Sequence, residues 1–300
     1  MGQFNLELGP RELVNSKRTK QINVSHGEFR RIEDKFIVNK SHRKFLINLL
    51  ETYLRPSYPM PGTLYTKIES LYFDSTELDL FKHHFMSLEK RYKLRIRRYA
   101  PNGVWDDGPA LLEIKKKIKK GEGESSISKK IRIHITTDAL NDLKEGKKIT
   151  LSEELYQLNS KLDLHIFEKR VRQANYLIEL FNLKPRISVS YNRFAFELNN
   201  LRATLDSDLE IAVHNEITSH NCQDLKASDV WTLASFEMKK FSQLKHMVFE
   251  IKHTGTIPSW AEQALIQLQI QKNHFSKYCW SISRLINANE NARKNEAMTC

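Results

Sequence analysis

Cysteines, glycines, prolines and long apolar runs are all scarce in this chain of 300 residues. The three cysteines, at 222, 279 and 300, lack any Cys-x-x-Cys spacing, which argues against a disulfide framework and a zinc site and favours a reducing compartment. With only 10 Gly and 8 Pro against 40% hydrophobic residues, a fibrous or disordered protein is excluded. No apolar run approaches the ~18–20 residues of a membrane helix, and the N-terminus carries no secretory signal. We therefore expect a soluble, cytoplasmic protein with no transmembrane segment.

Familiar catalytic signatures are also missing. The chain has no glycine-rich phosphate loop of the Walker or dinucleotide type, no His-Glu-x-x-His spacing among its 11 histidines, and no serine nucleophile elbow. Any phosphate site in this protein must consequently be built from side chains, without a glycine cradle.

Positive charge is the most prominent feature that is present. Lys and Arg number 48 against 36 Asp and Glu, which gives a net charge of +12. Such an excess favours an acidic partner: nucleic acid, anionic lipid or a phosphate-rich small molecule. The alternative is a basic but otherwise ordinary soluble surface.

Three short segments carry this charge on one face of a strand. Residues 93–97, 112–115 and 130–134 alternate charged with apolar side chains, and alternate side chains of a strand point to opposite sides of the sheet. Guanidinium and ammonium groups gathered on one sheet face bind polyanions, most naturally phosphate. Glutamates among them could hold a hard cation that bridges protein and phosphate.

The same pattern recurs along the chain. Glu-x-Lys occurs at 33/35, 113/115, 237/239 and 250/252, Arg-x-Arg at 95/97 and Lys-x-Arg at 130/132. For a single strand, a solvated face explains such charges. The repetition, with Leu, Ile and Phe on the opposite parity, predicts instead that helices cover the apolar side and that the charged side lines a lumen. Because unpaired buried charge is costly, that lumen would hold an anion.

The periodicities predict an antiparallel α+β domain, because strands outnumber helices and no strand–helix–strand unit repeats. Strands are expected at 29–38, 68–73, 186–196, 201–209, 235–240 and 247–252, beside the three above. Helices are expected after an N-cap at Ser41, after a cap at Asp74 or Ser75, within 137–183, after Pro258 and at 277–288. We expect a flexible arm at 1–27, one domain over 28–287 and a polar tail at 288–300.

Ten short motifs occur in the order found in the polyphosphate polymerase domain of the vacuolar transporter chaperone (VTC) family, a branch of the triphosphate tunnel metalloenzyme (CYTH-like) superfamily. The chain resembles this family over nearly its whole length. The motifs are Arg31-Ile-Glu-Asp-Lys35-Phe, Tyr72-Phe-Asp-Ser75, Leu94-Arg95-Ile-Arg97, Leu112-Glu113-Ile-Lys115, Ser128-Lys-Lys130-Ile-Arg132, Tyr191-Asn-Arg193, Leu201-Arg202-Ala-Thr-Leu-Asp206, Val248-Phe-Glu250-Ile-Lys252, Pro258-Ser-Trp260 and Phe275-Ser-Lys277-Tyr278.

The resemblance implies an eight-stranded antiparallel closed β-barrel, a tunnel with helices packed outside. It implies binding of ATP or another nucleoside triphosphate and transfer of its γ-phosphate to a growing inorganic polyphosphate chain, with Mn²⁺ or Mg²⁺. A membrane-associated partner for export would be compatible with this role. Carried over by position, Lys35, Arg95, Arg97, Lys115, Lys130, Arg193 and Arg202 would be catalytic, with Arg132, Lys252 and Lys277 as further phosphate ligands and Glu250, Glu113 and Glu33 as metal ligands.

Two rival functions stay open. A triphosphatase of the same superfamily would need the same cations and metal. A non-catalytic polyphosphate- or nucleic-acid-binding protein is the other, but nucleic-acid binding predicts aromatic platforms among the basic residues. The aromatic residues here lie mostly on the apolar parity, so no nucleic-acid partner is expected.

Some positions depart from a simple assignment. Arg193 shares strand parity with Ile187, Val189 and Tyr191, so the alternation places it in the lumen only if the strand bulges or turns its register. Lys130 is taken as inward and its neighbour Lys129 as outward because Lys130 shares parity with Arg132. His274 stands where the family often has a basic residue, and the Glu237/Lys239 pair has no clear family equivalent.

Overall fold

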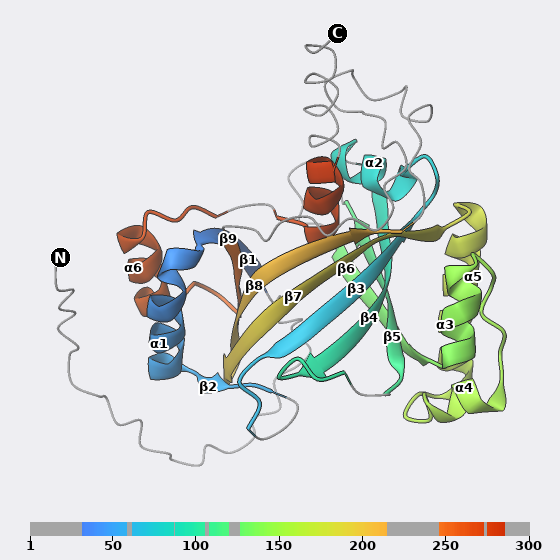
Figure 1. Ribbon diagram of the computed structural model, residues 1–300, viewed down its shortest axis with the longest axis horizontal. Helices are drawn as coiled ribbons and strands as arrows, with labels where there is room; N and C mark the ends of the chain where they lie inside the picture. The colour runs from blue at the N-terminus through green and yellow to red at the C-terminus, as the bar shows by residue number, and fades with distance from the viewer. Residues whose placement is uncertain are drawn as a thin grey trace, which may run out of the picture. The chain divides into compact units, whose positions relative to one another are not determined.

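The computed structural model describes residues 32–58, 62–86, 88–105, 108–119, 127–214, 246–272 and 275–285 (Figure 1). All strand pairings in this part of the chain are antiparallel and belong to one sheet, which confirms the antiparallel α+β class. The strands are β1 (Ile32–Asn39), β2 (Arg55–Pro56), β3 (Thr66–Asp74), β4 (Lys90–Pro101), β5 (Ala110–Ile118), β6 (Ile127–Ile135), β7 (Lys184–Leu198), β8 (Leu201–Val213) and β9 (His246–His253).

Eight strands follow the order β1-β9-β8-β7-β3-β4-β5-β6, and β2 pairs with β7 at the side. In the described residues no hydrogen-bonded ladder joins β1 to β6, so a closed barrel is not seen. Part of the reason is that Phe36 on β1 forms a bridge with Lys272, which occupies part of the β1 edge. The sheet nevertheless curls, because Glu33 on β1 interacts electrostatically with Lys115 on β5 although five strands lie between them in the sheet order.

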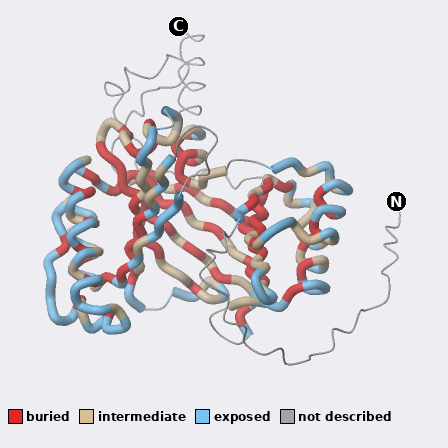
Figure 2. Tube along the Cα trace, turned by 180° about the vertical axis from the view of Figure 1, so that it is seen from behind, coloured by how far each residue is buried: buried red, intermediate tan, exposed pale blue. Residues whose placement is uncertain are grey.

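Two apolar clusters cover the outer face of the sheet (Figures 1 and 2). One packs α3 (Thr137–Lys144), α4 (Glu153–Gln157) and α5 (Leu164–Leu180) against strands β3 to β6. The other packs α1 (Arg43–Tyr53) and α6 (Ser259–Gln267) against β1, β7, β8 and β9. The expectation that helices cover the apolar parity is therefore confirmed.

A third apolar cluster lies on the opposite, inner face. There α2 (Asp79–Phe85) and a C-terminal helix at 277–285 pack on Tyr72 of β3, Val189 of β7 and Ile211 of β8. A bulge in β8 makes this possible: Asp208 adopts a positive φ of 56° and the β7–β8 register shifts by one residue. The bulge turns Leu209, Ile211 and Val213 inward, to the side on which Asp206 already lies.

Local caps explain how the chain enters its helices. Both suggested caps of α2 are used, since the Asp74 carboxylate accepts from the backbone N–H groups of Leu80 and Phe81 and the Ser75 hydroxyl accepts from that of Asp79. The prediction of Ser41 as an N-cap was wrong. Ser41 lies in a 3₁₀ turn, η1 (Lys40–His42), whose capping side chain is Asn39, because the chain tightens before α1 begins.

Several expectations fall on undescribed parts of the chain. The arm at 1–27, the strand at 235–240 with Glu237 and Lys239, His274 and the tail at 288–300 all lie outside the described residues. Among the residues that are described, no helix is both long and apolar enough to span a bilayer.

Candidate functional site: the charged inner face

The candidate site is the inner face of the sheet, defined as the strand positions that point away from α1, α3, α5 and α6. Alternation along each strand separates these positions from the apolar ones: Leu94 and Ile96 are buried in an outer cluster, while Arg95 between them reaches the inner side. The charged members that interact with one another are Glu33, Lys35, Arg95, Arg97, Glu113, Lys115, Lys130, Arg132, Arg193, Asp206, Glu250 and Lys252, joined by Lys277 from the C-terminal helix.

Glu113 lies at the centre of one group of cations. Its side chain is only 2% exposed, and its two oxygens accept from Arg95 Nε and Arg132 Nε, both at 2.7 Å. Lys130 and Arg97 lie 3.5 and 3.7 Å away. Burial alone would raise the pKa of Glu113, but the surrounding cations, Arg95 above all, hold it well below its ordinary value. One carboxylate thus offsets only part of four positive charges.

Glu33 and Glu250 form a second group with two lysines. Lys35 Nζ lies 2.7 Å from Glu33 and 3.7 Å from Glu250, while Lys252 Nζ lies 3.8 and 2.5 Å from the same two residues. Burial raises the pKa of Glu33, but Lys35, Lys252 and Lys115 together lower it to about 2. Lys35 also donates to the Phe275 carbonyl oxygen at 3.4 Å, which ties β1 to the segment before the C-terminal helix.

This pair of carboxylates suits a hard divalent cation. Among the described residues no cluster of three or more metal-binding side chains occurs, but Mg²⁺ typically uses one or two carboxylates together with phosphate oxygens and water. Burial, and then repulsion from the Glu33 carboxylate, act to raise the pKa of Glu250, but Lys252 and Lys35 outweigh them and hold this pKa below its ordinary value. A bound cation would relieve that repulsion. Glu113, in contrast, is already surrounded by cations.

Arg193 and Lys277 converge on Asp206, which is fully buried. Arg193 donates from Nε and Nη2 to the two Asp206 oxygens at 2.6 and 2.8 Å, and Lys277 Nζ lies 2.5 Å away. Lys277 also lies over the Tyr191 ring at 4.6 Å. The condition set from sequence, a bulge or a turned register in the strand of Arg193, is not what brings Arg193 inward. Ile187, Val189, Tyr191 and Arg193 share one parity, and that parity faces inward because the C-terminal helix covers its apolar residues. The extra residue in the β7–β8 pairing lies in β8, and the one in the β3–β7 pairing lies in β7 between Pro185 and Ile187.

Three further predicted residues differ in setting. Lys115 keeps part of its surface exposed to solvent. Desolvation of its amine, and then the charges of Lys35 and Lys93, lower its pKa against the raising effect of Glu33. Burial, with Arg132 and Arg95 nearby, lowers the pKa of Lys130 to about 8. Arg202 lies at the margin of the inner face, 3.6 Å from Glu197, and contacts none of the three carboxylate groups above.

The register separates Lys129 from Lys130. Lys130 is directly opposite Lys115, whereas Lys129 is opposite Lys116, whose amine lies over the Tyr92 ring of the outer cluster at 5.5 Å. Lys129 therefore points outward, as its parity predicted.

Sequence reasoning missed the roles of two inner-face residues. Tyr72 accepts from Arg95 at 3.0 Å and stacks on Tyr278, with ring centroids 5.1 Å apart. Asp206 lay inside a recognised motif, yet nothing in its alternating neighbours signalled a buried counter-charge. The one available clue was that Asp206 stands in a largely apolar strand, between Leu205 and Ser207. A carboxylate buried in such a strand needs a cation beside it.

Known proteins resemble this chain in sequence over most of its length. A family model described as the VTC domain matches residues 30–286. Subunit 4 of the vacuolar transporter chaperone complex of Trypanosoma cruzi (strain CL Brener) is 25% identical over 244 residues, 75% of this chain and 29% of that protein. The chain thus spans less than a third of that relative's length.

Solved structures share the general arrangement only distantly. A protein of Pyrococcus horikoshii OT3 has a TM-score of 0.38 at 13% identity, covering 84% of this chain and 99% of that one. A Bacillus halodurans protein provisionally assigned as an adenylate cyclase has a TM-score of 0.39 at 14% identity, covering 82% and 93%. Likenesses at this level support no conclusion about activity. The match over residues 30–286, in contrast, shows that the chain belongs to the VTC domain family.

Proposed function

We propose that the inner face forms a tunnel in which the chain transfers the γ-phosphate of a nucleoside triphosphate, ATP foremost, to a growing inorganic polyphosphate chain. The observation that carries this proposal is the convergence of cations from six strands, β1, β4, β5, β6, β7 and β9, around four carboxylates in the described part of the chain, Glu33, Glu113, Asp206 and Glu250. Such a surface is stabilised by a polyanion, and membership of the VTC domain family supports polyphosphate as that polyanion.

The chain's own residues can supply most of what this reaction needs. The acceptor is already a phosphate oxyanion, so little general-base chemistry is required, and positioning with charge neutralisation carries the rate. Arg95, Arg97 and Arg193 offer fixed, always-charged donors for the transferred phosphoryl group, while Lys35 and Lys130 offer mobile ones. Glu250 and Glu33 would hold Mn²⁺ or Mg²⁺, which neutralises phosphate charge when bound.

A triphosphatase is the second candidate, since water could replace the phosphate acceptor at the same site. The T. cruzi relative is a subunit of a complex, and by extension we propose that this chain works with a membrane-associated partner protein that exports the product. We keep the cytoplasm as the proposed location.

The test is product analysis of purified protein incubated with ATP and either Mn²⁺ or Mg²⁺. Polymerisation predicts a ladder of polyphosphate on a gel with one ADP released for each phosphate incorporated. Free phosphate with ADP and no ladder would indicate the triphosphatase. Neither product, with inorganic triphosphate still raising the melting temperature, would indicate a binding protein.

A further inference from the structure

Beyond the group around Glu113, the inner face carries two cation-rich rows that contain no carboxylate of their own on β4 to β6. Lys93 of β4, Lys115 of β5 and Lys130 of β6 are directly opposite one another across three neighbouring strands. Lys130, at one end of this first row, lies 3.5 Å from Glu113, and Lys115 interacts with Glu33 beyond ion-pair distance. The next inner row, two residues further along, places Arg91 opposite Lys117. Successive inner rows lie roughly 6.8 Å apart along a strand.

Like charges directly opposite each other on neighbouring strands destabilise a sheet, so these rows call for a counter-ion. Within the described residues, Lys93, Lys115, Lys117 and Arg91 have no Asp or Glu within ion-pair distance; Lys93 donates to the Ser276 hydroxyl at 2.6 Å, and Arg91 to the His84 carbonyl oxygen at 3.4 Å. Repulsion between these cations also acts on the pKa of Lys117. Burial first, and then Arg91 and Lys93, lower this pKa.

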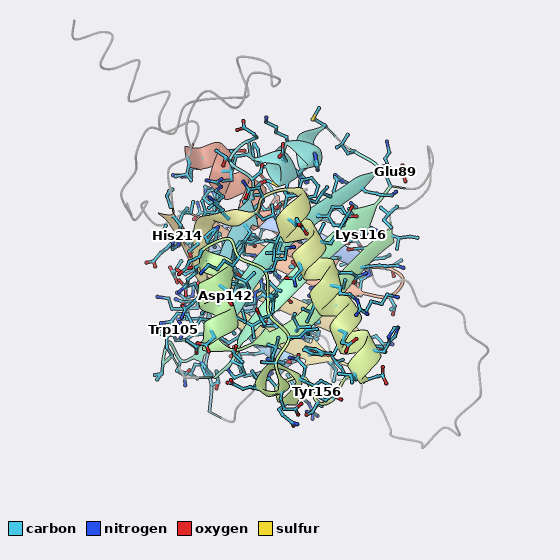
Figure 3. The ribbon with its side chains drawn as sticks, turned by 90° about the vertical axis from the view of Figure 1, so that its right-hand side faces the viewer. Glu89, Trp105, Lys116, Asp142, Tyr156 and His214 are labelled. Atoms are coloured by element: carbon cyan, nitrogen blue, oxygen red, sulfur yellow. The ribbon has the colours of Figure 1, made fainter. Side chains whose placement is uncertain are left out.

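The preceding row behaves differently, because it contains Glu113 between Arg95 and Arg132. Positive charge on the inner face is therefore partly neutralised where Arg95 and Arg97 lie and less neutralised toward the start of β4. That end of β4 to β6 is marked in Figure 3 by Glu89 and Lys116, whereas Trp105, beyond the other end of β4, lies far from them.

We propose that Arg91, Lys93 and Lys117, together with Lys115, form an extension of the site that binds the outer units of an inorganic polyphosphate chain. This inference rests on the proposed function and names the direction in which the polymer runs: from Arg95 and Arg97, along β4 and β5, toward Glu89. A single triphosphate is held by the inner groups, whereas a chain long enough to span both of these rows gains contacts at each one.

Polyphosphate fits the rows better than nucleic acid does. Strands that bind single-stranded nucleic acid combine cations with aromatic side chains on which the bases stack. The aromatic residue between the two rows, Tyr92, has the opposite parity and packs on the outer cluster beneath Lys116.

The test compares long-chain polyphosphate with inorganic triphosphate on the double variant Arg91→Gln/Lys117→Gln. The matched control is Lys116→Gln, a neighbouring lysine on the same strand that faces outward. In a binding titration at fixed ionic strength, we expect the double variant to bind long-chain polyphosphate about 10-fold more weakly, about 1.4 kcal/mol, and to lose much less affinity for triphosphate. The variant Arg91→Gln/Lys117→Arg, which keeps the positive charge at position 117, should restore long-chain affinity relative to the double glutamine variant.

Three results would overturn the inference: an equal loss for both ligands, the same loss in Lys116→Gln, or no loss at all. A fourth result would also overturn it: a single-stranded DNA oligomer that competes with bound polyphosphate as effectively as free long-chain polyphosphate does. The binding readout is independent of turnover. If the wild-type protein makes no polymer but shows the length-selective loss, the proposed polymerase activity fails and the polyphosphate-binding extension stands.

Discussion

Glu113 gives the sharpest prediction, because two roles for it lead to opposite results. The structure makes it a buried counter-charge for Arg95, Arg97, Lys130 and Arg132, whereas the family resemblance suggests a metal ligand. Glu113→Gln removes the charge but keeps the shape, so it creates no cavity and tests charge alone.

The magnitude follows from how each partner is exposed. Lys130 and Arg132 are 42% and 50% exposed, so water screens their loss and they contribute little. Arg95 and Arg97 are mostly buried, and removing the carboxylate from such a pair costs about 3–5 kcal/mol. With solvent reaching part of the site, we expect the free energy of unfolding to fall by about 3 kcal/mol, or roughly 6–12 °C in melting temperature for a domain of this size.

The same substitution should tighten phosphate binding. With Glu113 neutral, the cations around it lose their internal partner, and inorganic triphosphate should bind about 10-fold more tightly, about 1.4 kcal/mol. The assay is urea denaturation with and without triphosphate, in metal-free buffer. Glu210→Gln on the outer face, where the carboxylate accepts from the Ser190 hydroxyl at 3.2 Å, is the matched control.

An unchanged free energy of unfolding would refute the counter-charge role. Weaker triphosphate binding that appears only in the presence of Mn²⁺ would place Glu113 among the metal ligands instead.

Three further substitutions test other parts of the site. Glu250→Gln should lower metal-dependent turnover by about two orders of magnitude or more, because several kcal/mol of charge stabilisation depend on the cation it would hold; unchanged turnover would remove it as a metal ligand. The pKa of Lys130 is lowered to about 8, so its amine loses its proton as pH rises from 7 to 9, and wild-type affinity for triphosphate should fall over this range. The Lys130→Arg variant stays charged and should lose less of its affinity. Parallel pH profiles of affinity for the two proteins would contradict this. Tyr278→Phe removes the hydroxyl that donates to buried Asp74, so the free energy of unfolding should fall by about 1–3 kcal/mol. The buried Cys279 thiol on the same helix should also react faster with a thiol reagent. An unchanged alkylation rate would show that the C-terminal helix is held by other contacts.

Alternation predicted the inner face well wherever a strand was regular. Lys93, Arg95 and Arg97 share a side because strand geometry has a period of two, and Lys115 and Lys130 follow on the next strands. The same rule assigned Lys129 outward. Helical spacing likewise predicted that apolar residues within 137–183 would cover the sheet, although they form three helices.

Long-range features were not predictable from these periods. Which face of the sheet Tyr191 and Arg193 lie on depends on the C-terminal helix. The apolar residues of that helix are more than 80 positions away in the sequence and cover part of the inner face. The β8 bulge at Asp208 changes which parity faces inward without any glycine to signal it. Nothing in the sequence signalled the bridge between Phe36 and Lys272, which takes up part of the β1 edge; within the described residues the sheet is not closed by hydrogen bonds.

The central claim is phosphoryl transfer to a polymer on the inner face, and γ-labelled ATP tests it most directly. Purified protein with Mn²⁺, labelled ATP and a short unlabelled polyphosphate primer should place the label in chains longer than the primer, while Glu250→Gln should leave those chains unlabelled. Label recovered only as free phosphate, or equal labelling by the variant, would contradict the account.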